Sequence, residues 1–304
     1  MPDFASAAKN LPTSNAKADM VSGSTVDFFI QFWGVRSKIS SPGKDTIRYG
    51  GNTSCVEMCL GKKRLIFDGG TGLRVLGNKL LSQMPVEAHL FFTNCHWDSI
   101  QGFPFFTPAF IPGNCFHIYG AAASNGSSME QQLACQMQPP TFPVPIQVMQ
   151  SELQFYSLTS GEKILLDDVT VETAALNFLE SSIGYRVTWG GYSVVYATAR
   201  SRNHKYIDDK LLRLAHQADL LILDAPDGIS AEETLNSNVL HWRDELWQTG
   251  IATAKAAEVK QVVISRYDPD YDDDFLDQME AKIHSVFPNL LLAREGMILP
   301  IFQG

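Results

Sequence analysis

The chain alternates between short apolar runs and polar breaks rich in glycine and proline, a pattern that predicts strands and helices in turn. In the first half, leucines at helical spacing predict a helix from Leu73 to Ser82, and a second helix is expected from Ser128 to Gln136. Apolar or alternating runs predict the strands Val26–Trp33, Ser54–Leu60, Arg64–Asp68, His89–Thr93 and Phe116–Gly120.

The second half repeats this order of strands and helices. Its predicted strands are Leu153–Leu158, Val169–Ala174, Ile183–Trp189, Tyr192–Thr198, Leu220–Asp224 and Lys260–Ser265, and its predicted helices are Asp208–Gln217, Leu246–Ala257 and Asp272–Phe287. Strand clusters that are followed by helices, twice over, predict an α/β protein, an αββα sandwich of two packed mixed β-sheets with helices outside. A site is expected at the carboxyl ends of the strands.

Composition supports one domain after a short tail. Residues 1–25 are rich in Ala, Ser, Asn and Lys without apolar periodicity, which predicts a flexible N-terminal tail. Residues 26–304 are expected to form a single domain, because 45% of the chain is hydrophobic and only 19% is charged. The net charge of -9 argues against nucleic acid as a partner, and the one dense basic run, Arg200–Lys205, is interpreted as a solvated loop.

The cysteines and the apolar runs bear on the compartment. The five cysteines form an odd set without a CxxC pair, which predicts free thiols in a reducing compartment; they are Cys55, Cys59, Cys95, Cys115 and Cys135. No apolar run is long enough to span a membrane, and the N-terminus lacks the pattern of a signal peptide. A cytoplasmic protein without a membrane span is therefore expected.

The segment Thr93–Gly102 offers the first candidate chemistry, because it follows a predicted buried strand and contains His96 and Asp98. Metallohydrolases collect imidazoles and carboxylates in such loops. Cys95 could add a thiolate, but adjacent residues tend to point to opposite sides, so it is interpreted as a small packed residue. Without further ligands, His96 is interpreted as a hydrogen-bonded structural histidine.

Two other segments have structural interpretations. The proline-punctuated aromatic run Phe103–Phe110 cannot form a regular helix or central strand and is expected to pack in the core or at its rim, with a partner surface as the alternative if it is exposed. The acidic run Asp268–Asp274 lacks the glycine and glutamate of a calcium loop. Asp272 is instead expected to cap the helix that follows.

Several motifs, taken together, resemble the metallo-β-lactamase-fold hydrolases, in the branch with phosphodiesterase-like and RNase Z-like members. The matching pieces, in the family's order, are Phe32–Arg36, Arg48–Cys55, Ile66–Gly72, Thr93–Gly102, Tyr192–Thr198 and Asp268–Pro269. The resemblance implies the αββα sandwich and a dinuclear zinc site. In that family the aspartate matching Asp68 is not a metal ligand, and Asp68 is expected to fix the glycine turn after it.

The resemblance also implies that most ligand positions have changed. The family's H-x-H-x-D-H motif falls on Asn94, His96, Asp98 and Ser99, its next histidine on Phe178, its bridging aspartate on Ala199, and its last histidine on Arg266 or Tyr267. A further histidine position matches Asp244. Each zinc would keep one ligand, His96 or Asp98, where three or four are needed. Arg266 would add a fixed positive charge and is expected to pair with Asp98, while Asp224 could join this polar network.

The leading hypothesis is therefore a degenerate metal site in a catalytically inactive protein, a pseudoenzyme without metal or cofactor that binds another protein or a small ligand in the cleft. A homodimer is compatible with the fold family. The first alternative is a hydrolase of phosphodiesters or esters with a single-metal or metal-free site around His96 and Asp98. The second alternative is a structural or assembly factor with an exposed apolar surface.

Overall fold

The computed structural model describes residues 28–176, 182–198, 209–225 and 244–301. The predicted tail at residues 1–25, the basic run at 200–205, and the predicted ligand positions Phe178 and Ala199 lie outside the described residues, as does the side chain of Asp244. Within the described residues, no helix is long and apolar enough to cross a membrane.

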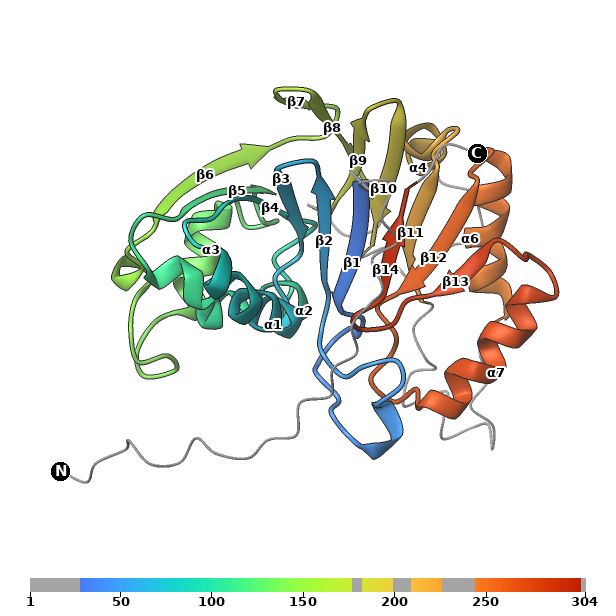
Figure 1. Ribbon diagram of the computed structural model, residues 1–304, viewed down its shortest axis with the longest axis horizontal. Coiled ribbons are helices and arrows are strands. Elements are labelled where there is room, and N and C mark those ends of the chain that lie inside the picture. The colour runs from blue at the N-terminus through green and yellow to red at the C-terminus, as the bar shows by residue number, and fades with distance from the viewer. Residues whose placement is uncertain (1–27, 177–181, 199–208, 226–243, 302–304) are drawn as a thin grey trace.

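Two mixed sheets of seven strands each form the centre of the protein (Figure 1). The order in the first sheet is β14 (Ile298–Pro300), β1 (Phe28–Gly34), β2 (Cys55–Leu60), β3 (Lys63–Phe67), β4 (Glu87–Phe92), β5 (Cys115–Ala121) and β6 (Glu152–Leu158). The order in the second sheet is β13 (Leu290–Leu292), β12 (Gln261–Ser265), β11 (Leu220–Asp224), β10 (Tyr192–Ala197), β9 (Ile183–Trp189), β8 (Val169–Ala175) and β7 (Lys163–Leu166).

Aromatic side chains join the two sheets face to face. Phe67 of β3 packs against Tyr196 of β10, with ring centroids 5.2 Å apart, and Phe91 of β4 packs against Tyr185 of β9 at 5.4 Å. These four rings are completely buried. Because side chains alternate along a strand, the residues next to them in sequence, such as Ile66 and Leu90, face the other side of the first sheet.

Helices cover the two outer faces, as the αββα prediction requires (Figure 1). On the first sheet, leucines of α1 (Thr71–Leu80) and Met129 and Leu133 of α3 (Met129–Gln136) share a core with Ile66 and Leu90. On the second sheet lie α4 (Asp209–Ala215), α6 (Asp244–Ala256) and α7 (Asp273–His284). The short helix α2 (Trp97–Ile100) follows β4. The two-sheet sandwich with outer helices is thus confirmed.

Each sheet contains a block of parallel strands, β3–β6 in the first and β10–β13 in the second. Parallel strands present their carboxyl ends at one edge. Asp68 follows β3, Thr93 follows β4, Asp224 ends β11 and Arg266 follows β12. The fold therefore brings four polar residues from distant parts of the chain to one end of the sandwich.

Most predicted elements are present, with differences at the ends. The predicted helix Leu73–Ser82 begins earlier, at Thr71, and its last residues form a 3-10 turn. Asp272 caps α7 as predicted, since its Oδ1 accepts a hydrogen bond from the backbone N–H of Phe275 at 2.7 Å. The strands β7, β13 and β14 were not predicted; β13 and β14 have three residues each, which is too short for a periodic signal.

The aromatic run Phe103–Phe110 forms two 3-10 turns, Phe103–Phe105 and Thr107–Phe110, in agreement with the exclusion of a regular helix or central strand. Phe103 and Phe106 are completely buried beneath the first sheet, whereas Phe105 is 55% exposed. Core packing is therefore the main role of this run, and it does not present a continuous apolar surface.

Gly102 allows the segment after α2 to cross closely over the turn between β3 and α1. Its N–H donates to the carbonyl of Gly69 at 2.8 Å. A Cβ added at Gly102 would lie 1.9 Å from the carbonyl oxygen of Gly70, which is a backbone atom that cannot rotate away. This close approach holds the Asp98 segment against the Asp68 turn.

We expect Gly102→Ala to lower the free energy of unfolding by about 1–3 kcal/mol or more, because the backbone must separate to admit the methyl group. Urea unfolding measures the change. Gly43→Ala is the matched control, since its Cβ would meet nothing closer than 3.9 Å. Equal stability of the two variants would contradict the proposed close approach.

Candidate functional site

A buried arginine lies at the centre of the site. Arg266 is 6% exposed and its guanidinium lies within reach of three carboxylates. Its Nη2 is 2.6 Å from Oδ2 of Asp98, its Nε is 3.3 Å from Oδ1 of Asp224, and its Nη1 is 3.6 Å from Oδ2 of Asp68. Nη1 also donates to Oγ of Ser99 at 3.0 Å. Every nitrogen of the guanidinium therefore faces an oxygen.

The backbone around this centre is held in an unusual conformation. Asp68, Arg266 and Lys38 all have positive φ angles, of 59°, 58° and 61°. Residues with side chains adopt this region at a cost of order 1–3 kcal/mol each and keep it only where the surroundings fix it. All three residues contact the ion pairs around Arg266. Asp68 and Arg266 do so with their side chains, and Lys38 does so with its backbone N–H.

Asp68 connects the two sheets. Its carboxylate accepts hydrogen bonds from the N–H and the hydroxyl of Thr93, both at 2.9 Å, and from the hydroxyl of Tyr196 at 2.9 Å. The amides of the glycine turn bond elsewhere, to the carbonyls of Ser54 and Ser99. The expectation that Asp68 fixes that turn is therefore wrong, because its carboxylate points to β4 and β10.

Asp98 has a second partner besides Arg266. Its Oδ2 accepts a hydrogen bond from the backbone N–H of Lys38 at 3.0 Å. The ammonium of Lys38 in turn pairs with Asp268, which lies two residues beyond Arg266. These contacts attach the segment after β1 to the ends of β4 and β12.

The charges of the centre stabilise one another. Burial alone would lower the pKa of Arg266, but the carboxylates of Asp98, Asp224 and Asp68 raise it above its ordinary value. Burial raises the pKa of Asp68, and Arg266 together with the donors Thr93 and Tyr196 opposes that rise. Arg266 therefore keeps its positive charge wherever the protein is folded.

Several predicted ligand positions are near this centre, but they are not arranged as ligands. Asn94 is buried and its Oδ1 accepts a hydrogen bond from the backbone N–H of His96 at 2.9 Å. The His96 ring is exposed and makes no hydrogen bond with the described residues, which differs from the expected structural histidine. The predicted Asp98–Arg266 pair is confirmed. Arg266 faces the site, whereas the Tyr267 hydroxyl donates to carbonyls of Ile264 and Ala293.

Comparison with known proteins identifies the fold. The chain is similar in structure to the metallo-β-lactamase fold protein YhfI from Bacillus subtilis, with 17% identity over 90% of this chain and 99% of that one and a TM-score of 0.60. It is similar to the short form of human tRNase Z, with 16% identity, coverages of 90% and 100%, and a TM-score of 0.59. The chain has the metallo-β-lactamase fold.

A third similar structure is zinc-bound PqqB from Methylobacterium extorquens, with 14% identity, coverages of 89% and 99%, and a TM-score of 0.61. The sequence alone gives less information: no protein-family model matches it, and neither does any curated protein. Because the identities are low, these likenesses establish the fold, and the chemistry must be judged from the side chains.

Two zinc ions do not fit the described side chains at this end of the metallo-β-lactamase fold. Asp98 is bonded to Arg266 and Lys38, the Ser99 hydroxyl accepts from Arg266, and His96 is exposed. A guanidinium cannot lose its proton to become a ligand, and it repels a dication that approaches the same carboxylates.

The cysteines agree with the sequence analysis. All five are free, without a disulfide. Cys95 is partly buried against the core on the outer face of the first sheet. Burial raises the pKa of its thiol to about 11, so it is protonated near neutral pH. This protonation favours the interpretation of Cys95 as a packed residue over a thiolate ligand.

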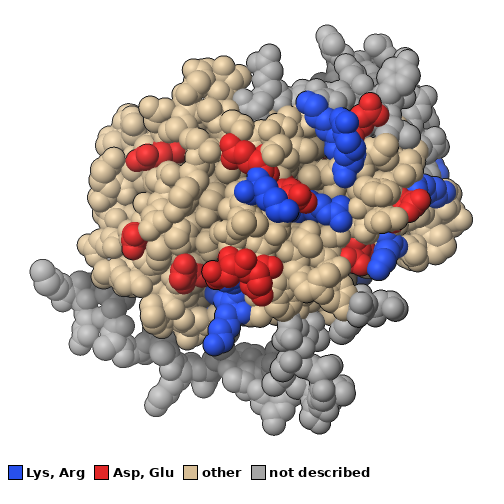
Figure 2. Space-filling view, turned by 90° about the horizontal axis from the view of Figure 1, so that it is seen from above, with Lys and Arg blue, Asp and Glu red and all other residues tan. Residues whose placement is uncertain are grey.

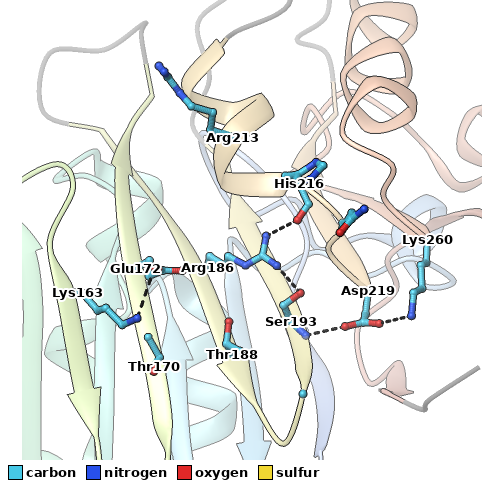
Figure 3. Close-up of a pocket in the computed structure, with 12 residues that line it drawn as sticks. Lys163, Thr170, Glu172, Arg186, Thr188, Ser193, Arg213, His216, Asp219 and Lys260 are labelled. Carbon is cyan, nitrogen blue, oxygen red and sulfur yellow. Dashed lines mark hydrogen bonds and ion pairs between the residues drawn. The ribbon is translucent and has the colours of Figure 1, made fainter.

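The opposite end of the sandwich has two pockets with charged linings. Figure 2 views this end from above and shows several places where basic side chains lie next to acidic ones, separated by residues of other kinds. One pocket, of about 600 Å³, lies beneath α4 (Figure 3). Arg186 in this pocket donates to the carbonyls of Leu214 and His216 at 2.8 and 2.7 Å, and Asp219 pairs with Lys260 at 2.9 Å. Arg186 thus caps the end of α4 and is not free for a ligand.

The second pocket contains a group that the sequence analysis missed. Glu87 and His89 of β4 and His117 of β5 each offer one ligand atom, and these atoms all lie within 4.8 Å of one another. The sequence predicted no metal on this chain, so this group departs from that expectation. Its signal, a Glu-x-His pair in one strand and a histidine in the next, becomes visible only when the register of the strands is known.

We expect Arg266→Met to lower the free energy of unfolding by about 3–5 kcal/mol, because the buried Asp68 and Asp98 and the partly buried Asp224 would lose the cation they share. Urea unfolding monitored by circular dichroism measures the change. Arg74→Met, at an exposed position on α1, is the matched control and should change stability by about 0.5 kcal/mol or less. Wild-type stability of the Arg266 variant would show that the centre does not depend on this charge.

We also expect Cys95 to be alkylated much more slowly than the exposed Cys135 at pH 8. With a pKa of about 11, only roughly one Cys95 side chain in a thousand is a thiolate at that pH. Timed labelling with iodoacetamide, followed by peptide mass spectrometry, compares the two in the same sample. Equal labelling rates would contradict the interpretation of Cys95 as a packed residue and would favour a reactive or metal-binding thiol.

Proposed function

We propose that this chain is a non-catalytic member of the metallo-β-lactamase fold, in which a buried ion-pair centre occupies the position of the metals and the protein acts by binding. One observation carries the proposal. The Arg266 guanidinium lies 2.6 Å from Asp98, the single carboxylate that the motif retains, and 3.3 Å from Asp224.

The electrostatics of this centre support the absence of metal-assisted hydrolysis. Zinc assists hydrolysis by lowering the pKa of a bound water to near neutrality, which requires a Lewis acid with an open position. A guanidinium has no open position and supplies only hydrogen-bond donors. Its donors already face Asp98, Ser99 and Asp224, so it has little capacity left to activate a water.

A binding role is supported by the rim of the centre. Trp97 is 56% exposed and precedes Asp98 directly in α2, while the equally exposed Ile39 follows Lys38, whose N–H bonds to Asp98. Two large exposed apolar side chains are therefore adjacent in sequence to the two residues that share this hydrogen bond. Tryptophan is among the residues that most often dominate binding energy. The occupant we propose is another protein or a small ligand at this rim.

The two alternatives have weaker support. A hydrolase based on His96 and Asp98 would need both groups at one reacting atom, but His96 is exposed and Asp98 is held by Arg266. An assembly factor based on the aromatic run would need that run at the surface, but Phe103 and Phe106 are completely buried.

The proposal predicts that purified wild-type protein hydrolyses phosphodiester, thioester and lactone substrates no faster than the buffer blank. It also predicts that Asp98→Asn leaves the bound-metal content unchanged. Both are measured on dialysed protein, by colorimetric assays and by elemental mass spectrometry. Asp45→Asn, at an exposed position, is the matched control.

Turnover that disappears in Asp98→Asn or His96→Gln, but not in Asp45→Asn, would overturn the proposal in favour of a hydrolase. A chelator distinguishes a single-metal hydrolase from a metal-free one. Activity that depends on a single metal is lost when the chelator is added, whereas metal-free activity remains. Metal that is lost specifically in Asp98→Asn would also overturn the proposal.

A further inference from the structure

The second pocket lies far from the ion-pair centre, although both involve β4. His89 is four residues before Thr93 along this strand, which corresponds to roughly 13 Å at the rise of a strand. In parallel register, His89 lies beside His117 of β5, and Glu87 lies two residues before His89 on the same face. The group is therefore at the amino ends of the parallel strands, opposite to the end with Arg266.

The three side chains lie in a groove of about 810 Å³ between the first sheet and the β7–β8 hairpin. The His117 side chain is 15% exposed and that of Glu87 is 69% exposed, so the group is accessible from solvent on one side. Leu165 and Asp167 of the hairpin segment face it across the groove. The positive charge of Lys63, which also lines the groove, is paired with Asp167. An ion could therefore enter without a conformational change.

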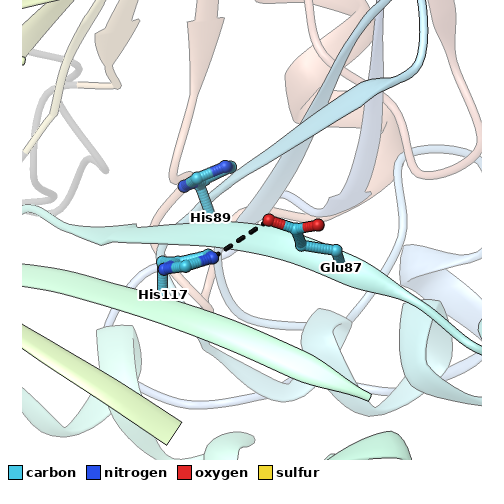
Figure 4. Close-up of side chains that lie close together, drawn as sticks. All are labelled: Glu87, His89 and His117. Atoms are coloured by element: carbon cyan, nitrogen blue, oxygen red, sulfur yellow. Dashed lines mark hydrogen bonds and ion pairs between the residues drawn. The ribbon is translucent and has the colours of Figure 1, made fainter. Parts of the chain in front are cut away.

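The imidazoles of His89 and His117 are stacked, with Glu87 beside them (Figure 4), and each imidazole lies near a tyrosine hydroxyl. Their centroids are 4.6 Å apart, with an angle of 15° between the planes. Nδ1 of His89 lies 3.3 Å from the hydroxyl of Tyr119, and Nδ1 of His117 lies 3.4 Å from that of Tyr156. Nε2 of His117 is 3.1 Å from Oε1 of Glu87. Metal-binding histidines are usually oriented in this way, by a hydrogen bond at the nitrogen that does not bind the metal.

Packing alone explains part of this arrangement. The stacking continues from strand to strand, with Phe91 on Tyr119 at 4.5 Å and Tyr119 on Tyr156 at 4.7 Å. Phenyl rings would serve this packing without burying polar nitrogens, so packing does not explain why two imidazoles and a carboxylate meet.

We propose that Glu87, His89 and His117 form a binding site for one divalent transition-metal ion, with Zn²⁺ as the best match. Two imidazoles and a carboxylate are an established ligand set for zinc with an open fourth position. The ion would replace the hydrogen bond between Glu87 and His117, and the fourth position would face the groove. This site is independent of the proposed non-catalytic role of the Arg266 centre.

The test uses the full chain after chelator treatment and dialysis, titrated with zinc chloride alone in a calorimeter. The expected result is one equivalent per chain, with affinity weakened by about tenfold or more in His89→Gln and in His117→Gln. His216→Gln, at an exposed position directly after α4, is the matched control and should bind like wild type. Circular dichroism confirms the fold of each variant, and the visible absorption of bound Co²⁺ in wild type reports the coordination without any substitution.

Zinc binding by wild type no tighter than by the double variant His89→Gln/His117→Gln would overturn the site. So would a Co²⁺ spectrum typical of the hydrated ion. Asp98→Asn separates this inference from the proposed function. Binding that is lost in Asp98→Asn and retained in His117→Gln would overturn both. Binding that is lost only in the histidine variants supports the new site and leaves the Arg266 centre as described.

Discussion

The burial of one positive charge among three negative ones is the constraint on which the site end of this protein depends. Asp68, Asp98 and Asp224 come from three separate segments, and Arg266 is the cation that they share. Removing a carboxylate from water costs several kcal/mol unless a partner compensates. The positive φ angles at Lys38, Asp68 and Arg266 add to this cost, so the ion pairs and the hydrogen bonds of Thr93 and Tyr196 must offset both.

This constraint also determines what the centre can do. A metal ion and a guanidinium can both neutralise clustered carboxylates, and in this respect either can stabilise the same strand ends. They differ in reactivity, because a metal exchanges its ligands and activates water, while a guanidinium keeps its protons and only donates hydrogen bonds. The geometry at Arg266 is thus compatible with a rigid scaffold whose binding surface lies outside the centre, at Trp97 and Ile39.

The sequence predicted correctly those features that depend on a short stretch of residues or on a matching motif. Apolar runs located all the parallel strands except the three-residue β13, and the matching motif positions led to the Asp98–Arg266 pair, which the structure contains. Interactions between distant segments were harder to predict. Asp68 bonds to Thr93 and Tyr196, and neither partner can be inferred from the residues around Asp68. The strand β7 lies at the sheet edge and has only four residues, Lys-Ile-Leu-Leu, which are too few to show a strand period in the sequence.

The group of Glu87, His89 and His117 is a second case in which the sequence does not show which distant segments lie together. A metal motif within one loop has fixed spacing in sequence, whereas a site across two strands depends on their register. A shift of β5 by one residue relative to β4 would turn His117 to the opposite face, towards the helices. Backbone hydrogen bonds already join these strands, so an ion there would add little to the topology. Its effect would be local, because it would place an electrophilic, exchangeable position in the groove facing the β7–β8 hairpin. The carboxyl end of β4 would then lie beside the fixed positive charge of Arg266, whereas its amino end would hold an ion with an open coordination position.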